Sequence, residues 1–205
     1  MKINIPYLFT LTSSLLLLSG CFNEPEPAYK KVPAGSRLYL SDNGLSDLKK
    51  SDFSKVGDYL NLDRNALTNV DEVASLTGLK WLRLNDNRLV SLPDLKALVN
   101  LRRIYLKNNR FAAVPLTLKD LPALTDIDLS GNPITEVPDW LAKKEGLENL
   151  SFSRTKITKL PDDLSAWKSL KTLQLGDLQL DPQEMARIRA AFDPENNPLG
   201  TAVVF

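Results

Sequence analysis

The sequence predicts an α/β solenoid, with short parallel strands on one face and helical or 3₁₀ turns on the other. Three observations lead to this fold class: an apolar pattern that recurs every 22 or 23 residues, an Asn near the end of most repeats, and a Pro at the start of several connecting segments. A fixed period of this length is typical of solenoids, because one unit cannot bury its apolar face alone and must stack on its neighbours.

Each repeat opens with an apolar residue, one variable residue and a second apolar residue. This is the alternation of a short strand that directs every second side chain inward. The first apolar positions are Leu38, Leu60, Leu82, Ile104, Ile127, Leu150 and Leu173. Two variable residues then precede Asn, at positions Asn43, Asn65, Asn87, Asn109 and Asn132. Asn suits such a turn because its side chain can cap neighbouring backbone groups.

The complete phrase, Leu-x-x-Leu-x-Leu-x-x-Asn-x-Leu, is clearest from Leu79 to Leu89 and resembles the leucine-rich repeat family. The resemblance covers about seven units within residues 36–180. It implies a horseshoe with a short parallel sheet on its concave face and an interior ladder of the Asn side chains. We therefore expect these Asn residues to be structural and not a ligand site. Thr155 takes the Asn position in the sixth unit and still offers a hydroxyl, whereas Leu178 in the seventh cannot hydrogen-bond.

Four Leu-Pro or Val-Pro pairs precede apolar residues spaced at three-residue steps, at Pro93, Pro115, Pro138 and Pro161. Pro is compatible with the start of a helical turn and not with its middle, so short helical or 3₁₀ turns are expected on the convex side.

Residues 181–205 are predicted to form a C-terminal cap. Asp181, Pro182 and Glu184 combine a helix cap, Pro at the first helical position and an acid at the third. Met185, Ile188 and Phe192 then fall on one face at helical spacing, so a helix over residues 182–192 is expected to cover the last repeat. Residues 201–205 would add an edge strand or simply pack there.

Residues 1–20 have a charged start, an apolar run and small residues, which are typical of an export signal. The alternative is a membrane-spanning helix, but the run has polar interruptions and is shorter than the ~20 apolar residues that a span needs. Residues 21–35 are rich in Pro and charge, and we expect them to form an extended tether.

The segment Leu18-Ser19-Gly20-Cys21 resembles the lipobox of bacterial lipoproteins. This resemblance implies cleavage before Cys21 and lipidation of its thiol, for example with palmitate; the alternative is a free thiol. In Gram-negative lipoproteins an Asp after the Cys tends to retain the protein in the inner membrane. Phe22 stands at that position and favours the outer membrane, at either its periplasmic or its surface face.

Composition excludes several functions. The chain has 26 basic and 25 acidic residues, so no global field favours nucleic acid. It contains no His and a single Cys, which excludes Ser-His-Asp and Cys-His catalysis, His- or Cys-based zinc sites and internal disulfides. We expect no cofactor other than the lipid, no metal and a monomeric protein.

The residues that flank the buried strand positions face the concave surface. Aromatic and Arg side chains are concentrated there in the first four repeats: Tyr39, Tyr59, Trp81, Arg83, Arg103 and Tyr105. These residue types dominate binding energy at interfaces, so they are the predicted ligand-binding site. The alternative is that Tyr and Trp are good strand residues on a passive surface. A third column, which includes Asp63 and Asn85, is expected on the same surface.

The sequence thus predicts a lipid-anchored protein of the bacterial cell envelope that acts as a non-catalytic interaction module for a protein or glycan partner. The alternative is a structural or assembly lipoprotein with a passive concave face. Asp126 and Asp128 could form a carboxylate pair for glycoside hydrolysis, because their spacing is near that of an inverting pair. General acid catalysis needs one carboxyl shielded from water, and an open sheet shields neither. We therefore expect that the protein is not an enzyme.

Overall fold

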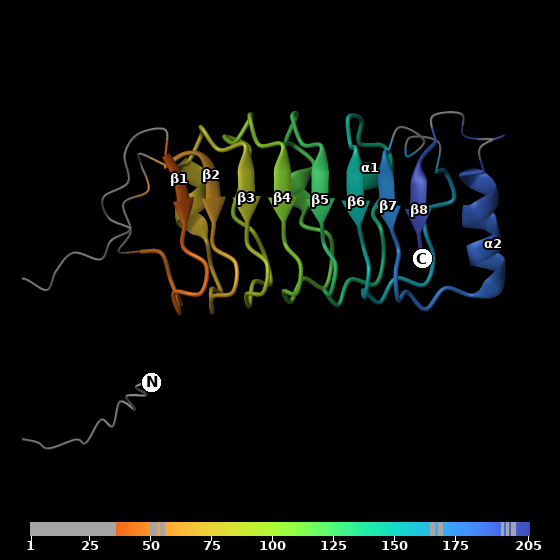
Figure 1. The fold of residues 1–205 in the computed structure, drawn as a ribbon, viewed down its shortest axis with the longest axis horizontal. Helices are drawn as coiled ribbons and strands as arrows, with labels where there is room; N and C mark the ends of the chain where they lie inside the picture. The colour runs from red at the N-terminus through yellow and green to blue at the C-terminus, as the bar shows by residue number, and fades with distance from the viewer. Residues whose placement is uncertain are drawn as a thin grey trace, which may run out of the picture.

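In the computed structural model, the described residues are 36–49, 53, 56–164, 167, 170–193, 195, 197 and 200–205. They form one solenoid in which parallel strands lie side by side in chain order (Figure 1). The predicted signal, Cys21 and the tether lie outside the described residues. The predicted fold class is confirmed.

The sheet contains eight strands within the described residues, all of them parallel and each next to its neighbour in sequence. They are β1 (Ser36–Tyr39), β2 (Val56–Asn61), β3 (Trp81–Arg83), β4 (Arg103–Tyr105), β5 (Asp126–Asp128), β6 (Asn149–Ser151), β7 (Thr172–Gln174) and β8 (Ala202–Val204). From β1 to β7, the central apolar residue of each strand pairs with that of the next, as the 22- or 23-residue period requires. We call the outward surface of this sheet the strand face.

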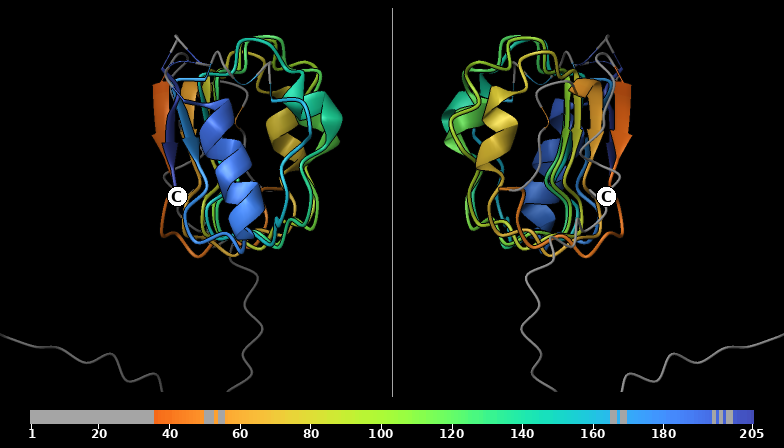
Figure 2. Two further views of the ribbon diagram at one scale, coloured as in Figure 1. Left: turned by 90° about the vertical axis from the view of Figure 1, so that its right-hand side faces the viewer. Right: turned by 90° about the vertical axis from the view of Figure 1, so that its left-hand side faces the viewer.

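The side opposite the sheet carries short helical segments (Figure 2). They are η2 (Asp71–Ser75), η3 (Leu116–Leu118) and α1 (Asp139–Ala142). Pro115 and Pro138 directly precede η3 and α1, as expected. After Pro93 the chain instead makes two successive turns, closed by bonds from Leu98 N to Leu95 O and from Leu101 N to Leu98 O.

Between the two sides lies a core of stacked Leu layers, in which Leu60, Leu82, Leu84 and Leu106 have no exposed surface. Because each turn buries its apolar residues against the turns before and after it, the core is continuous along the solenoid.

The Asn ladder lies inside the solenoid. Asn65, Asn87, Asn109 and Asn132 each donate from Nδ2 to carbonyls of their own turn and of the preceding one. Each Oδ1 accepts from a backbone N–H of the preceding turn. Asn43 differs, because it is exposed and, among the described residues, its side chain donates only to Ser41 O of its own turn. Thr155 does not take over the role of Asn, because its buried hydroxyl has no hydrogen-bond partner among the described residues.

One residue before each ladder position, the backbone turns through the left-handed region. The residues there are Asp42, Arg64, Asp86, Asn108, Gly131, Arg154 and Asp177, with φ between 53° and 68°. Gly tolerates this conformation because it has no Cβ, and Asn and Asp tolerate it because their side chains can hydrogen-bond locally. In other residues the Cβ atom lies too close to the following carbonyl oxygen. The two Arg residues are therefore strained positions.

We expect Arg154→Gly to raise the free energy of unfolding by about 0.5–1 kcal/mol, because Gly adopts φ 56° without strain. Arg154 is exposed, and its backbone N–H bond to Gly176 O does not depend on the side chain. Urea denaturation measures the change. Gly131→Ala is the opposite control, because its Cβ would lie 2.1 Å from Asn108 Oδ1 at a φ of +68°. A stability loss in the Arg154 variant would contradict the assignment of strain.

The C-terminal segment forms α2 (Pro182–Ala191) and β8, and α2 lies across the end of the solenoid (Figure 2). Asp181 accepts a hydrogen bond from Glu184 N at 2.7 Å, which caps the helix. Ile188 and Phe192 are buried, whereas Met185 is only partly buried. Residues 202–204 pair with β7, so the segment takes the edge-strand form of the two alternatives.

Candidate functional site

Two columns of side chains run along the strand face, in the register that the sequence predicts. The first is Arg37, Tyr59, Trp81, Arg103, Asp126, Asn149, Thr172. The second is Tyr39, Asn61, Arg83, Tyr105, Asp128, Ser151, Gln174. All six predicted binding residues therefore lie on one surface over β1–β4.

Four of these six side chains form a continuous stack. The ring centroids of Tyr39 and Tyr59 are 5.0 Å apart, and those of Tyr59 and Trp81 are 5.8 Å apart. The Arg103 guanidinium then lies 4.4 Å from the centroid of the Trp81 ring. Tilted ring pairs and cation–π contacts at these distances are attractive, so each side chain restricts the rotamers of the next.

Tyr59 is buried, contrary to the expectation that it offers binding surface. It is 9% exposed, because Tyr39 and Trp81 cover it from the neighbouring strands. Burial also raises the pKa of its hydroxyl. Tyr39, in contrast, is 59% exposed. The accessible part of the stack is therefore Tyr39 at one end and the partly exposed Trp81 and Arg103 at the other.

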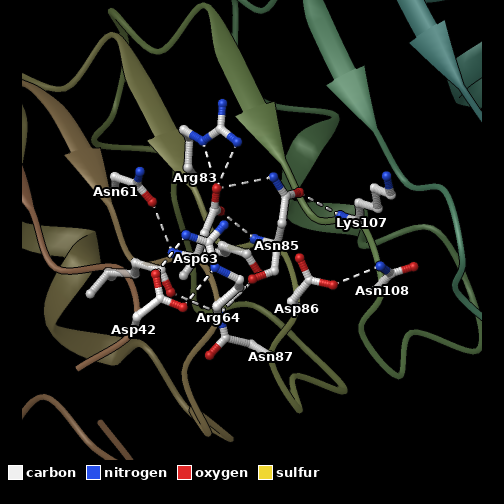
Figure 3. Close-up of polar contacts among 12 residues, drawn as sticks. Asp42, Asn61, Asp63, Arg64, Arg83, Asn85, Asp86, Asn87, Lys107 and Asn108 are labelled. Carbon is white, nitrogen blue, oxygen red and sulfur yellow. Dashed lines mark hydrogen bonds and ion pairs between the residues drawn. The ribbon is translucent and has the colours of Figure 1, made fainter. Parts of the chain in front are cut away.

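Arg83 and Tyr105 form a second contact, with the guanidinium 5.2 Å from the ring centroid. The guanidinium also binds Asp63, with both Nε and Nη2 2.7 Å from Oδ2 (Figure 3). Burial raises the pKa of the Tyr105 hydroxyl above its ordinary value. The Asp63 carboxylate and the Tyr105 ring thus both restrict the Arg83 side chain.

Asp63 and Asn85 are buried, although they were expected on the surface. The Asp63 side chain is 3% exposed, and its Oδ1 accepts from Asn85 N at 2.8 Å. Asn85 Oδ1 in turn accepts from Lys107 N at 2.9 Å (Figure 3). Both bonds span 22 residues, so the period that revealed the Asn ladder also brings these polar side chains together. Burial of Asp63 follows because Arg83 lies over it.

We expect Asp63→Ala to lower the free energy of unfolding by about 2–3 kcal/mol, because it leaves Arg83 without its carboxylate and Asn85 N without an acceptor. Asp63→Asn keeps an acceptor for Asn85 N and should recover part of this loss. Chemical denaturation of both variants measures the difference. Equal stability of the Ala variant and wild type would show that the buried contact contributes nothing.

Beyond β4, the strand face turns acidic and then small and polar. Asp126 accepts from Thr125 Oγ1 at 2.6 Å and Asn149 Nδ2 at 2.9 Å, and it lies 3.6 Å from Arg103 Nε. Asp128 Oδ1 accepts from Ser130 N and Oγ. Hydrogen bonds to neighbouring groups therefore fix both carboxylates.

The short side chains over β5–β7 leave a hollow of about 210 Å³ on the strand face. Its lining consists of Tyr105, Asp126, Ile127, Asp128, Asn149, Leu150, Ser151, Thr172 and Gln174. No group of three or more potential metal-binding side chains occurs in the part of the chain that the structure describes. In the same residues, no helix has both the length and the apolar character that a membrane crossing requires.

Comparison with known families finds a similarity in the central turns of the solenoid. Residues 77–134, which span β3–β5, match the Leucine rich repeat family model. The match and the fold support a leucine-rich repeat protein. Domains of this kind generally mediate protein interactions and are typically non-enzymatic. No curated protein is significantly similar to the chain.

Proposed function

We propose that this protein is a lipid-anchored component of the bacterial cell envelope that binds a protein or glycan partner through its strand face. The observation that carries the binding proposal is the arrangement of Tyr39, Trp81, Arg83, Arg103 and Tyr105 on one surface over β1–β4. Trp, Tyr and Arg are the residue types that most often dominate binding energy, especially where their rotamers are already restricted. Here the stack and the Arg83–Asp63 pair restrict them before any partner arrives.

The anchor is supported by the sequence alone, through residues 18–21 and the apolar run before them. Two or more acyl chains hold a protein stably on a bilayer, and the tether of residues 21–35 would separate the solenoid from the lipid. We expect radiolabelled palmitate to enter the wild-type chain and not Cys21→Ser. Equal labelling of the two chains would argue against a lipid anchor at this residue.

Site-specific photocrosslinking in cells tests the strand face. A photoreactive amino acid at Tyr39 (59% exposed, in β1) should give an adduct of defined mass. The matched control is Leu116, which is 65% exposed and belongs to η3 on the opposite side. Adducts from Leu116 alone would mean that the partner contacts the side opposite the sheet, which would contradict binding through the strand face.

One observation favours a second candidate, a structural or assembly lipoprotein with a passive strand face. The Arg and aromatic groups already satisfy one another through stacking, as Tyr59 shows by its burial. Under that reading, function would survive substitutions on the strand face and be lost when the tether is deleted.

A further inference from the structure

The hollow over β5–β7 is a feature that the aromatic and Arg surface does not explain. It exists because Ser151 and Thr172 are short where β3 and β4 carry Trp, Arg and Tyr. Its volume of about 210 Å³ is below the roughly 300–1,000 Å³ of small-molecule sites. The space therefore suits a single side chain of a partner better than a cofactor.

The two charged groups on its walls, Asp126 and Asp128, are both hydrogen-bond acceptors. Asn149 Nδ2 donates to Asp126 Oδ1, and Ser151 Oγ donates to Gln174 Oε1. Neutral donors are also present on the walls, for example the Tyr105 hydroxyl. Asn149 Oδ1 and Asp128 Oδ2 have no hydrogen bond among the described residues. An entering group that brings donors therefore finds a free carboxylate oxygen and a free amide oxygen.

The charges on the walls of the hollow also favour a group that carries donors. Arg83 is paired with Asp63, and Arg103 lies beside Asp126. Within the described part of the chain, Asp128 makes no ion pair and is only partly exposed. A carboxylate that a partner covers without a counter-charge is costly to desolvate, so its complement is a cation.

We propose that this hollow binds the side chain of a Lys or Arg residue of a protein partner. An ammonium or guanidinium group carries donors only and would place its charge against Asp128. The inference rests on the proposed function of the strand face and narrows it, because it requires a polypeptide partner with a basic residue at this position.

The test is an NMR titration of the full-length ¹⁵N-labelled chain with three probes. They are acetyl-Gly-Lys-Gly-amide, acetyl-Gly-Glu-Gly-amide and the neutral disaccharide maltose. We expect only the Lys peptide to shift the amides of β5–β7, with weaker shifts at high salt. Asp128→Asn should weaken its binding about tenfold, because a hydrogen-bonded charge is lost. Asp139→Asn, an exposed acid at the start of α1, should leave binding unchanged.

Shifts with maltose instead of the Lys peptide would overturn the proposal in favour of a glycan subsite. Equal shifts with the Lys and Glu peptides, or none with any probe, would also overturn it. None of these results would decide the proposed function itself, because photocrosslinking from Tyr39, which does not line the hollow, measures it separately.

Discussion

Asn109→Ala is expected to lower the free energy of unfolding by about 3 kcal/mol. The side chain is buried and donates to Leu84 O, Leu106 O and Lys107 O, while its Oδ1 accepts from Leu89 N. Truncation leaves these groups inside the solenoid without a partner. Because neighbouring turns stabilise one another, loss at a central turn should weaken the whole array. Urea denaturation followed by circular dichroism measures the free energy of unfolding of both chains.

Asn43→Ala is the matched control, because Asn43 holds the same repeat position but is exposed. Within the part of the chain that the structure describes, its side chain makes one bond, to Ser41 O, so the expected loss of unfolding free energy is below about 1 kcal/mol. Similar losses in the two variants would show that the repeat position, and not the buried bonding, determines the contribution of Asn.

Glu184→Ala is also expected to lower the free energy of unfolding by about 3 kcal/mol. Glu184 is buried in α2, and its Oε1 accepts from Leu160 N at 2.8 Å and from Arg187 Nη2 at 2.8 Å. Arg187 also donates to Leu160 O and Pro161 O, so the pair joins the capping helix to the last complete repeat. Glu136→Ala, an exposed acid, is the control and should have no measurable effect.

The Glu184 carboxyl also makes the stability of the fold depend on pH. The hydrogen bonds from Arg187 hold the pKa of the Glu184 carboxyl below its ordinary value of 4.5. Because the folded pKa is the lower one, the stabilisation is fully present well above pH 4.5 and disappears as the pH falls through the folded pKa. The stability difference between wild type and Glu184→Gln should therefore be constant near neutral pH and shrink below pH 4.5. A difference that stays constant into this acid range would contradict the pairing.

The fold could be predicted from the sequence because one period fixes the strand, the turn and the stacking partner together. Leu82 and Ile104 pair because both occupy the same position in successive repeats. For the same reason the two columns of the strand face have the predicted register.

The exposure of individual side chains could not be predicted in this way. Asp63, Asn85 and Lys107 share one repeat position, yet Asp63 and Asn85 are buried and Lys107 is only partly so. Exposure is determined by the neighbouring side chains. Arg83 covers Asp63, and Tyr39 and Trp81 cover Tyr59. Burial of Glu184 likewise depends on where α2 meets the Leu160 turn, and helical spacing alone does not give that placement.

The most direct test of the strand-face binding proposal is in-cell crosslinking and capture with the tagged full-length chain. Wild type is compared with Trp81→Ala/Tyr105→Ala and with the opposite-side control Val99→Ala/Leu116→Ala, after circular dichroism shows that all three fold alike. Tyr59 is left intact because it is buried. We expect a partner that wild type and the control capture and that the strand-face variant loses. Equal capture by all three would contradict binding through this surface.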